Sequence, residues 1–128
     1  MITFELVVGI HKILIKKYGG SAGIRDEAAL HSAVNRPYQT FDGEELYKTS
    51  VEKAAALIES LIKNHPFIDG NKRTGYVTMR ILLKKDRKDV KATEEEKYEF
   101  VVKVAAGESE YDEIKQWIEE KLIEVADH

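Results

Sequence analysis

The sequence predicts a small all-α fold of about six helices, and three observations support this. Apolar residues recur at spacings of three and four along most of the 128-residue chain, which is the period of one face of an α-helix. Glycine, proline and helix-capping residues interrupt this pattern. Strand patterns are weak, and only residues 38–45 and 89–91 are candidates for short extended pieces. We find no repeat or linker, so residues 1–128 are predicted to form one domain.

Capping and stop signals mark the expected helix ends. Asp26, the capping box at Thr93 and Ser109 are placed to begin helices. Gly19 and Pro66 end helices, because glycine adopts the left-handed conformation there and proline disfavours helical geometry at the preceding residue. The approximate helix ranges are 3–17, 26–34, 46–64, 71–84, 94–107 and 110–125. The apolar side chains expected to face the core are Leu6, Ile10, Ile13, Leu14, Val51, Ala54, Ala55, Ile58, Leu61, Ile62, Tyr76, Met79, Leu82, Leu83, Ile114, Ile118 and Leu122, with Trp117 at the margin.

Composition argues against several classes of protein. The net charge of −3 is unlike that of a general nucleic-acid binder, which has a basic surface. The chain has no cysteine, which excludes disulfides, thiolate zinc sites and cysteine nucleophiles. No apolar run approaches the roughly 18 residues of a membrane span, and the N-terminus lacks the basic region of a signal peptide. We therefore expect a cytoplasmic protein with no membrane or direct nucleic-acid partner.

One polar stretch between two apolar helices is not explained by packing. It covers residues 65–75 and places Gly70, Asn71, Lys72 and Arg73 at the expected start of a helix. The first turn of a helix has unpaired N–H groups at the positive end of the helix dipole, which together form a phosphate site. Two cations in that turn lose on the order of 0.3–1 kcal/mol each unless an anion binds. These four residues are therefore predicted to bind the phosphates of a nucleotide.

Three further residues of the stretch have separate expected roles. A carboxylate beside a phosphate site repels the ligand unless a divalent cation lies between them, so Asp69 is predicted to hold Mg²⁺ with a nucleotide such as ATP; an ordinary helix cap is the alternative. His65 can accept a proton near neutral pH and is the expected general base. Phe67 is expected to anchor the loop in the core. For Asn71, a phosphate hydrogen bond and a helix cap both remain open.

The stretch resembles the signature of the Fic/Doc family, which reads His, any residue, Phe, any residue, Asp or Glu, Gly or Ala, Asn, Gly or Lys, Arg. Residues 65–73 match every defined position, and residues 18–26, 41–56 and 106–117 also look like the Doc branch. The resemblance implies an all-helical fold with a short flap and nucleotide-dependent modification of a protein hydroxyl. It implies the roles given above, with His65 as the base, Asp69 on Mg²⁺ and residues 70–73 binding the phosphates. The flap that aligns the target peptide would fall near residues 38–45, with Tyr38, Gln39, Thr40 and Phe41.

Two positions depart from the AMP-transferring members and look like the death-on-curing (Doc) branch. Lys72 stands where those members have Gly, and Tyr76 where they have a second Arg. Similarity to Doc toxins implies transfer of the terminal phosphate of a nucleoside triphosphate to a threonine or serine hydroxyl of a translation factor, which for Doc is elongation factor Tu. We find no inhibitory Ser/Thr-x-x-x-Glu-Gly/Asn motif, so a small antitoxin partner is expected.

Other functions remain open from the sequence. The same residues could transfer AMP or another nucleotidyl group, or the site could bind a nucleotide or peptide without turnover. A metal-dependent phosphohydrolase is disfavoured, because one His and one Asp are too few ligands for a two-metal site. His11 and His31 are expected to be structural or surface residues, and His128 has no expected role.

Overall fold

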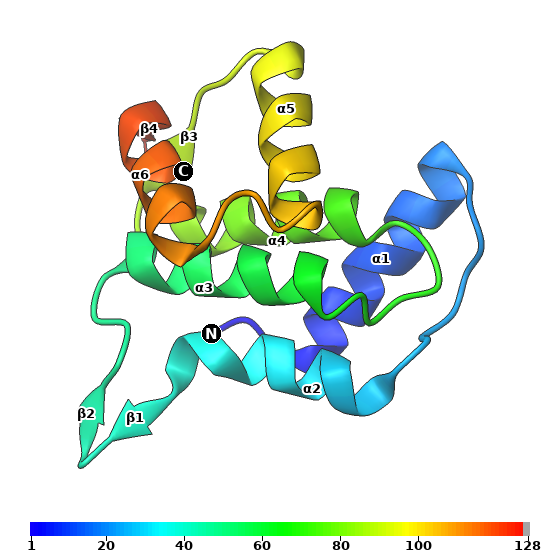
Figure 1. Cartoon of the computed structure of the whole chain (residues 1–128), viewed down its shortest axis with the longest axis horizontal. Coiled ribbons are helices and arrows are strands. Elements are labelled where there is room, and N and C mark those ends of the chain that lie inside the picture. Colours follow the sequence, from blue (N-terminus) through cyan, green and yellow to red (C-terminus); the bar gives the residue numbers. More distant parts are fainter. Residues whose placement is uncertain (127–128) are drawn as a thin grey trace.

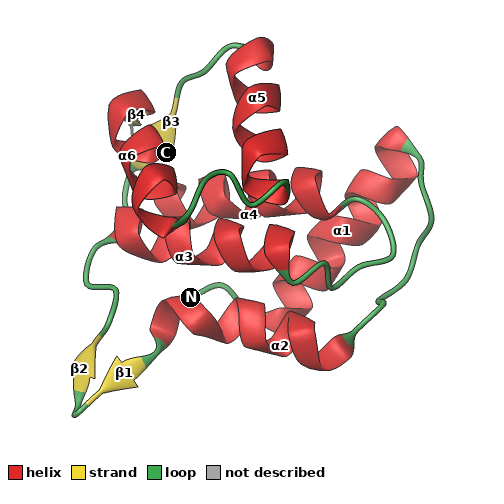
Figure 2. Cartoon of the chain, in the orientation of Figure 1, coloured by secondary structure: helices red, strands yellow, loops and turns green. Residues whose placement is uncertain are grey.

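The computed structural model describes residues 1–126, and His128 therefore lies outside it. The described chain has six α-helices, a short 3₁₀ helix and two two-stranded antiparallel sheets (Figures 1 and 2), so the predicted all-α fold is confirmed. None of the helices in residues 1–126 combines the length and apolar character that crossing a membrane requires. The helices are α1 (Phe4–Tyr18), α2 (Glu27–Asn35), η1 (Arg36–Tyr38), α3 (Ser50–Lys63), α4 (Asn71–Lys84), α5 (Glu94–Ala105) and α6 (Tyr111–Lys121). The strands are β1 (Thr40–Phe41), β2 (Glu44–Glu45), β3 (Lys88–Val90) and β4 (Leu122–Glu124).

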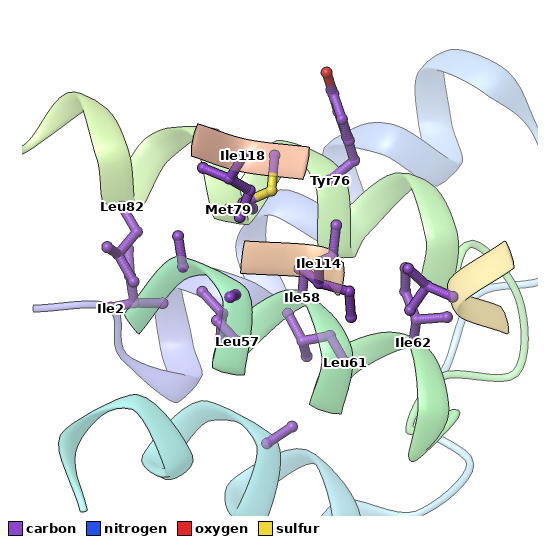
Figure 3. Packing of buried hydrophobic residues seen from close by; sticks show 14 of the residues in the cluster. Ile2, Leu57, Ile58, Leu61, Ile62, Tyr76, Met79, Leu82, Ile114 and Ile118 are labelled. Atoms are coloured by element: carbon purple, nitrogen blue, oxygen red, sulfur yellow. The ribbon is translucent and has the colours of Figure 1, made fainter. Parts of the chain in front are cut away.

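Helix α3 is the centre of the packing. It contacts α2, α4, α5 and α6, and its residues Ala54, Leu57 and Ile58 are fully buried. The hydrophobic cluster around it draws side chains from all six helices (Figure 3). Gly75 lets α4 approach closely, because a Cβ there would lie 3.2 Å from Cγ1 of Ile62. The two helices run in opposite directions, and the loop that joins them lies at one end of the bundle (Figure 1).

The start of α3 and one face of α1 differ from the expectation. Helix α3 begins at Ser50 rather than near residue 46, because the Thr49 side chain accepts a hydrogen bond from the N–H of Glu52 and caps the helix there. In α1, Ile13 is 65% exposed, so its assignment to the core was wrong.

The last helix is shorter than expected at both ends. Its N-cap is Glu110 rather than Ser109, and the N–H of Glu110 donates to Oε1 of Glu113 at 2.9 Å. The helix ends at Lys121, and Leu122 begins β4, which pairs antiparallel with β3. The expected extended piece at residues 89–91 thus overlaps a strand of a two-stranded sheet, and its partner strand replaces the last turn of the expected helix.

The expected hairpin between α2 and α3 is present. Strands β1 and β2 pair antiparallel, and Asp42 and Gly43 connect them with φ of 53° and 80°. Two successive positive φ values are characteristic of the tight turn whose twist suits a two-residue hairpin loop.

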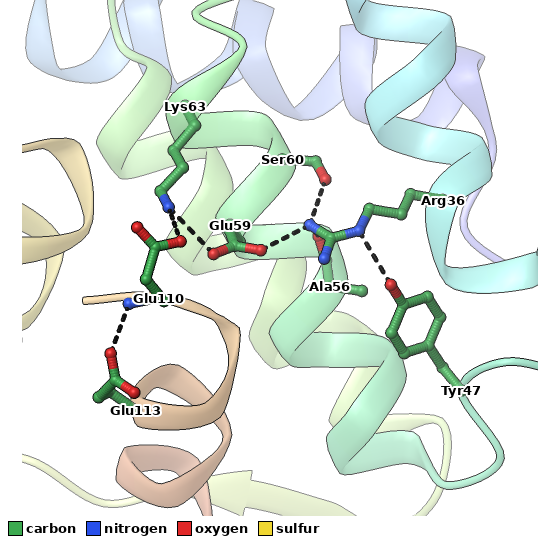
Figure 4. Close-up of polar contacts among 8 residues, drawn as sticks. All are labelled: Arg36, Tyr47, Ala56, Glu59, Ser60, Lys63, Glu110 and Glu113. Atoms are coloured by element: carbon green, nitrogen blue, oxygen red, sulfur yellow. Dashed lines mark hydrogen bonds and ion pairs between the residues drawn. The ribbon is translucent and has the colours of Figure 1, made fainter. Parts of the chain in front are cut away.

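An ion-pair network centred on the buried Glu59 joins η1, α3 and the start of α6 (Figure 4). Arg36 donates to Oε1 of Glu59 at 2.8 Å and to the hydroxyl of Tyr47 at 3.1 Å. The other oxygen of Glu59 pairs with Lys63 at 3.1 Å, and Lys63 also reaches Glu110 at 2.7 Å. The Glu59 side chain is only 8% exposed, so two cations compensate for the hydration that its carboxylate has lost.

Replacing Arg36 with Met should lower the free energy of unfolding by about 2–4 kcal/mol, because Glu59 stays buried and loses one of its two cations. Urea denaturation followed by circular dichroism measures this loss. Lys48→Met is the matched control, since it removes the exposed Lys48–Glu44 pair and should change stability much less. Equal losses in the two variants would contradict the interpretation.

Candidate active site

Phe67 anchors the loop between α3 and α4 in the core, as expected. Phe67 is 1% exposed, and its ring stacks on His11 of α1 with centroids 3.8 Å apart and planes 5° apart. His11 is also buried, and its Nε2 donates to the carbonyl oxygen of Asp69 at 2.8 Å. A ring stack and a hydrogen bond from the same side chain therefore hold both ends of the segment 67–69 against α1.

Residues 20–26 run antiparallel beside this loop. The N–H of Ile68 donates to the carbonyl of Gly23 at 3.1 Å, and the N–H of Arg25 donates to the carbonyl of Pro66 at 2.7 Å. The loop is thus held on one side by α1 and on another by residues 20–26, which follow α1. These contacts restrict the conformation of the loop.

The carboxylate of Asp69 is exposed and oriented by backbone groups. Its Oδ1 accepts from the N–H of Gly70 at 2.9 Å and its Oδ2 from the N–H of Ser21 at 3.2 Å. Gly20 is required beside it, because a Cβ there would lie 2.6 Å from Oδ2. Two hydrogen bonds leave acceptor capacity on a carboxylate, which has about four acceptor positions. Residues 1–126 contain no group of three or more His, Cys, Asp or Glu placed to hold a metal, so a cation at Asp69 needs oxygens from a ligand.

The first turn of α4 leaves its backbone donors free. Gly70 is the N-cap, with φ of 79° and no side chain to cap the helix, so neither Asp69 nor Asn71 has the capping role considered above. The first N–H bonded within the helix is that of Thr74, which donates to the carbonyl of Gly70 at 3.0 Å. Within the described residues, the N–H groups of residues 71–73 have no hydrogen-bond partner. Unpaired donors at the positive end of a helix are the arrangement that binds anions.

Three cations lie near this turn. The guanidinium of Arg73 lies over the Tyr18 ring, 4.1 Å from its centroid, and the Lys17 ammonium is 5.2 Å from the same centroid. Lys72 is exposed and forms no ion pair with residues 1–126. Cation–π contacts at exposed sites contribute only about 0.5–1 kcal/mol, so the charges of Arg73 and Lys17 remain available to an anion.

The side chain of Asn71 turns away from the first-turn donors and holds the loop. Its Oδ1 accepts from the N–H of Phe67 and its Nδ2 donates to the carbonyl of Phe67, both at 2.9 Å. These two bonds fix which end of the amide is nitrogen. The Nδ2 amino group of Asn71, a donor, therefore faces Nδ1 of His65 at 3.2 Å. Nδ1 of His65 is therefore the accepting nitrogen, and a neutral ring carries its proton on Nε2. Only the backbone N–H of Asn71 is left for a phosphate.

A pocket of about 370 Å³ adjoins the first turn of α4. The loop and turn residues 69–73 line one side of it, and Tyr98 and Val101 of α5 line another. Tyr76 also lines it, and burial raises the pKa of its phenol, which stays neutral. His65 is exposed but does not line this pocket. The free donors thus open onto a hollow between α4 and α5 rather than onto a flat surface.

The structure does not bring the expected flap residues 38–41 to the loop. The β1–β2 hairpin precedes the N-terminal end of α3, whereas the loop follows its C-terminal end (Figure 1). Helix α3, with 14 residues at 1.5 Å per residue, is about 21 Å long. The hydroxyl of Tyr38 accepts a hydrogen bond from the N–H of Ile2 at 2.8 Å, far from His65. The segment that lies beside the loop is residues 20–26.

Sequence reasoning missed the roles of His11 and Arg25 at this loop. His11 was expected to be structural or on the surface, and it is structural. A signal existed, because Val7 and His11 are four residues apart and both face the core, where a polar side chain usually has a specific partner. His31 is half-exposed and stacks on Phe4 with centroids 4.0 Å apart.

His11→Phe should lower the free energy of unfolding by about 1–3 kcal/mol, because the ring stack is kept while the Asp69 carbonyl loses its donor. Urea denaturation measures the change. His31→Phe makes the same substitution at a half-exposed histidine and should have little effect. A larger loss for His31→Phe would contradict the assigned role of His11.

The contact between Asn71 and His65 predicts the tautomer of the unliganded protein. At a pH where the ring is neutral, ¹⁵N-detected long-range NMR correlations should show the proton of His65 on Nε2. Asn71→Ala should release the ring and give a mixture of tautomers. A ring protonated on Nδ1 in the unsubstituted protein would exclude the hydrogen bond.

Comparison with known proteins places this loop within a family. The model of the Fic/DOC family matches residues 1–83, which include the loop and nearly all of α4. A protein of Mycolicibacterium smegmatis named "Toxin Doc" is 46% identical over 59 residues, an alignment that covers 46% of this chain and 45% of the toxin. The similarity thus spans about half the length of that relative. Because the family model covers well over half of the chain, the chain belongs to the Fic/DOC family.

Proposed function

We propose that this chain transfers the terminal phosphate of a nucleoside triphosphate such as ATP to a serine or threonine hydroxyl of another protein. The observation that carries the proposal is the first turn of α4, where free N–H groups lie beside the cations Lys72 and Arg73 at the edge of a pocket. The same loop exposes the imidazole of His65 and the carboxylate of Asp69. Enzymes accelerate phosphoryl transfer mainly through positioning and charge stabilisation, and these groups supply both.

The phosphates would be bound by backbone rather than by polar side chains of the turn. The free N–H groups of residues 71–73 point along the helix axis at its positive end, so they favour a polyanion. Lys72 and Arg73 add charge to the same place, which explains two cations where acidic residues are usually favoured. The Asn71 side chain is occupied by Phe67 and contributes only its backbone.

The donor set fits Mg²⁺ only together with a nucleotide. Mg²⁺ is usually held by one or two carboxylates plus phosphate oxygens and water, and Asp69 is one carboxylate with acceptor capacity left. Asp69 would hold the ion, which supplies neutralisation of the phosphate charge. A phosphohydrolase that depends on two metal ions is disfavoured, because residues 1–126 have no cluster of three or more ligating side chains.

His65 acts as the general base in the proposed reaction. The target hydroxyl oxygen attacks the γ-phosphorus, the bond from that phosphorus to the bridging oxygen breaks, and a nucleoside diphosphate leaves. The hydroxyl proton passes to Nε2 of His65. A lone pair on Nε2 requires the proton to sit on Nδ1, so the ring must leave its contact with Asn71 when the substrates bind. Catalytic hydrogen bonds that form only in the substrate complex are common.

Two residues favour phosphate transfer over AMP transfer. Lys72 and Tyr76 stand where AMP-transferring members of the family have Gly and Arg, and both line the pocket. The similarity to a protein named Toxin Doc supports a role as a cytoplasmic toxin with a small antitoxin partner. Elongation factor Tu is the proposed target. AMP transfer by the same residues is the second candidate, favoured by the motif itself, which the two activities share.

Two radiolabelled nucleotides distinguish the candidates. Purified protein is incubated with elongation factor Tu and Mg²⁺, with ATP labelled at either the γ- or the α-phosphate. We expect label to reach the factor from the γ-phosphate alone. Label from the α-phosphate would establish AMP transfer and overturn the proposed phosphate transfer. Label from neither position, in this mixture and in a whole translation extract, would leave only a binding module.

His65→Ala should reduce transfer by about 10²–10⁴-fold while the protein stays folded, because the hydroxyl loses its base. His31→Ala is the matched control, since it removes another exposed histidine and should leave transfer unchanged. Transfer that persists in His65→Ala would contradict the assigned base.

A further inference from the structure

Three successive carbonyl groups at the end of α3 are all bound by two neighbouring residues. The Arg25 side chain donates from Nε to the carbonyl of His65 at 2.6 Å and from Nη2 to the carbonyl of Asn64 at 2.9 Å. The carbonyl of Pro66 accepts from the backbone N–H groups of Arg25 and Asp26 at 2.7 Å and 3.1 Å. The carbonyl groups of residues 64–66 therefore all accept hydrogen bonds from residues 25 and 26.

The middle carbonyl belongs to a residue in a sparsely populated conformation. His65 has φ of 47°, in the left-handed region that residues other than glycine adopt at some cost. Such conformations persist only where surrounding contacts hold them in place, and they are common at functional sites. The His65 side chain is exposed and its Nδ1 faces Asn71, the first residue of α4, at 3.2 Å, while its carbonyl is held by Nε of Arg25.

The chemistry of Arg25 suits binding of these two carbonyls. Its guanidinium presents donors in a rigid fork, which matches two adjacent carbonyls better than a single ammonium does. It forms no ion pair with residues 1–126, so its directional hydrogen bonds go to the backbone of Asn64 and His65. A cation is also favourable at the negative end of α3.

We infer that Arg25 is a positioning residue for His65: its fork holds the left-handed turn and thereby aims the imidazole toward the phosphate site. This inference rests on the proposed function of His65 as the base. Two restraints then act on that residue. Arg25 fixes its backbone, and Asn71 holds its ring at 3.2 Å. Neither the Arg25 guanidinium nor the Asn71 amide bonds to the free N–H groups of residues 71–73.

A double-mutant cycle in the transfer assay tests the inference. Arg25→Ala should lower kcat by about 10–100-fold and change KM for ATP by less than about threefold, because misplacing the base slows the step without weakening phosphate binding. Arg25→Lys should fall between Arg25→Ala and the unsubstituted protein. In the His65→Ala background, Arg25→Ala should cause no further loss.

Lys12→Ala, which removes an exposed cation of α1, is the control and should leave kcat unchanged. A rise in KM alone, or an equal loss in the His65→Ala background, would overturn the inference.

An NMR measurement keeps the test independent of activity. In Arg25→Ala, the ¹⁵N resonance of His65 Nδ1 should move toward that of free imidazole, since the ring leaves Asn71 when the turn relaxes. Should Arg25→Ala fail to fold, Arg25→Lys is measured in its place, with a smaller movement in the same direction. An unchanged resonance overturns the role of Arg25. Absence of any transfer by the unsubstituted protein, with a moved resonance, would instead reject the proposed function and retain the positioning role.

Discussion

The left-handed turn at His65 sets the course of the chain through the candidate site. Helix α3 ends at Lys63, two residues earlier, and the turn sends the chain back so that Phe67 enters the core and α4 runs antiparallel to α3. A second positive φ, at Gly70, starts α4 without a side-chain cap. Both properties that the proposed chemistry needs follow from these two turns, since one aims an imidazole outward and the other leaves three amide donors free.

Rigid packing below the loop makes this geometry stable. Gly75 and the alanines of α3 let the two helices lie close together, and the Arg36–Glu59 pair ties η1 to α3. His11 then holds the loop to α1 through a stack on Phe67 and a bond to a backbone carbonyl. A site built on helix ends that are fixed in this way is more precise than one carried by a free loop.

Local signals in the sequence predicted the helices well and the contacts of the site only in part. Caps such as Asp26 and Thr93 act within four residues, so their helices begin where expected. The start of α6 was misplaced, because Ser109 is the better N-cap by local preference, whereas the helix begins after Glu110, whose N–H donates to the side chain of Glu113. His11 and Arg25 act across 58 and 40 residues; the helical pattern could indicate that His11 faces the core, but no local pattern identifies a partner so far along the chain. The hairpin and the loop lie at opposite ends of α3, and a hairpin signal carries no information about which end of α3 it will face; the role of residues 38–41 as a flap stays a prediction.

The central claim is that the first-turn amides of α4 bind the phosphates of a nucleotide. Titration of ¹⁵N-labelled protein with ATP and Mg²⁺, followed by amide resonances, tests it most directly. We expect the largest shifts on residues 71–73 and a lower affinity for ATP when Arg73 is replaced by Ala. Shifts concentrated elsewhere, with the amides of residues 71–73 unmoved at saturation, would contradict it.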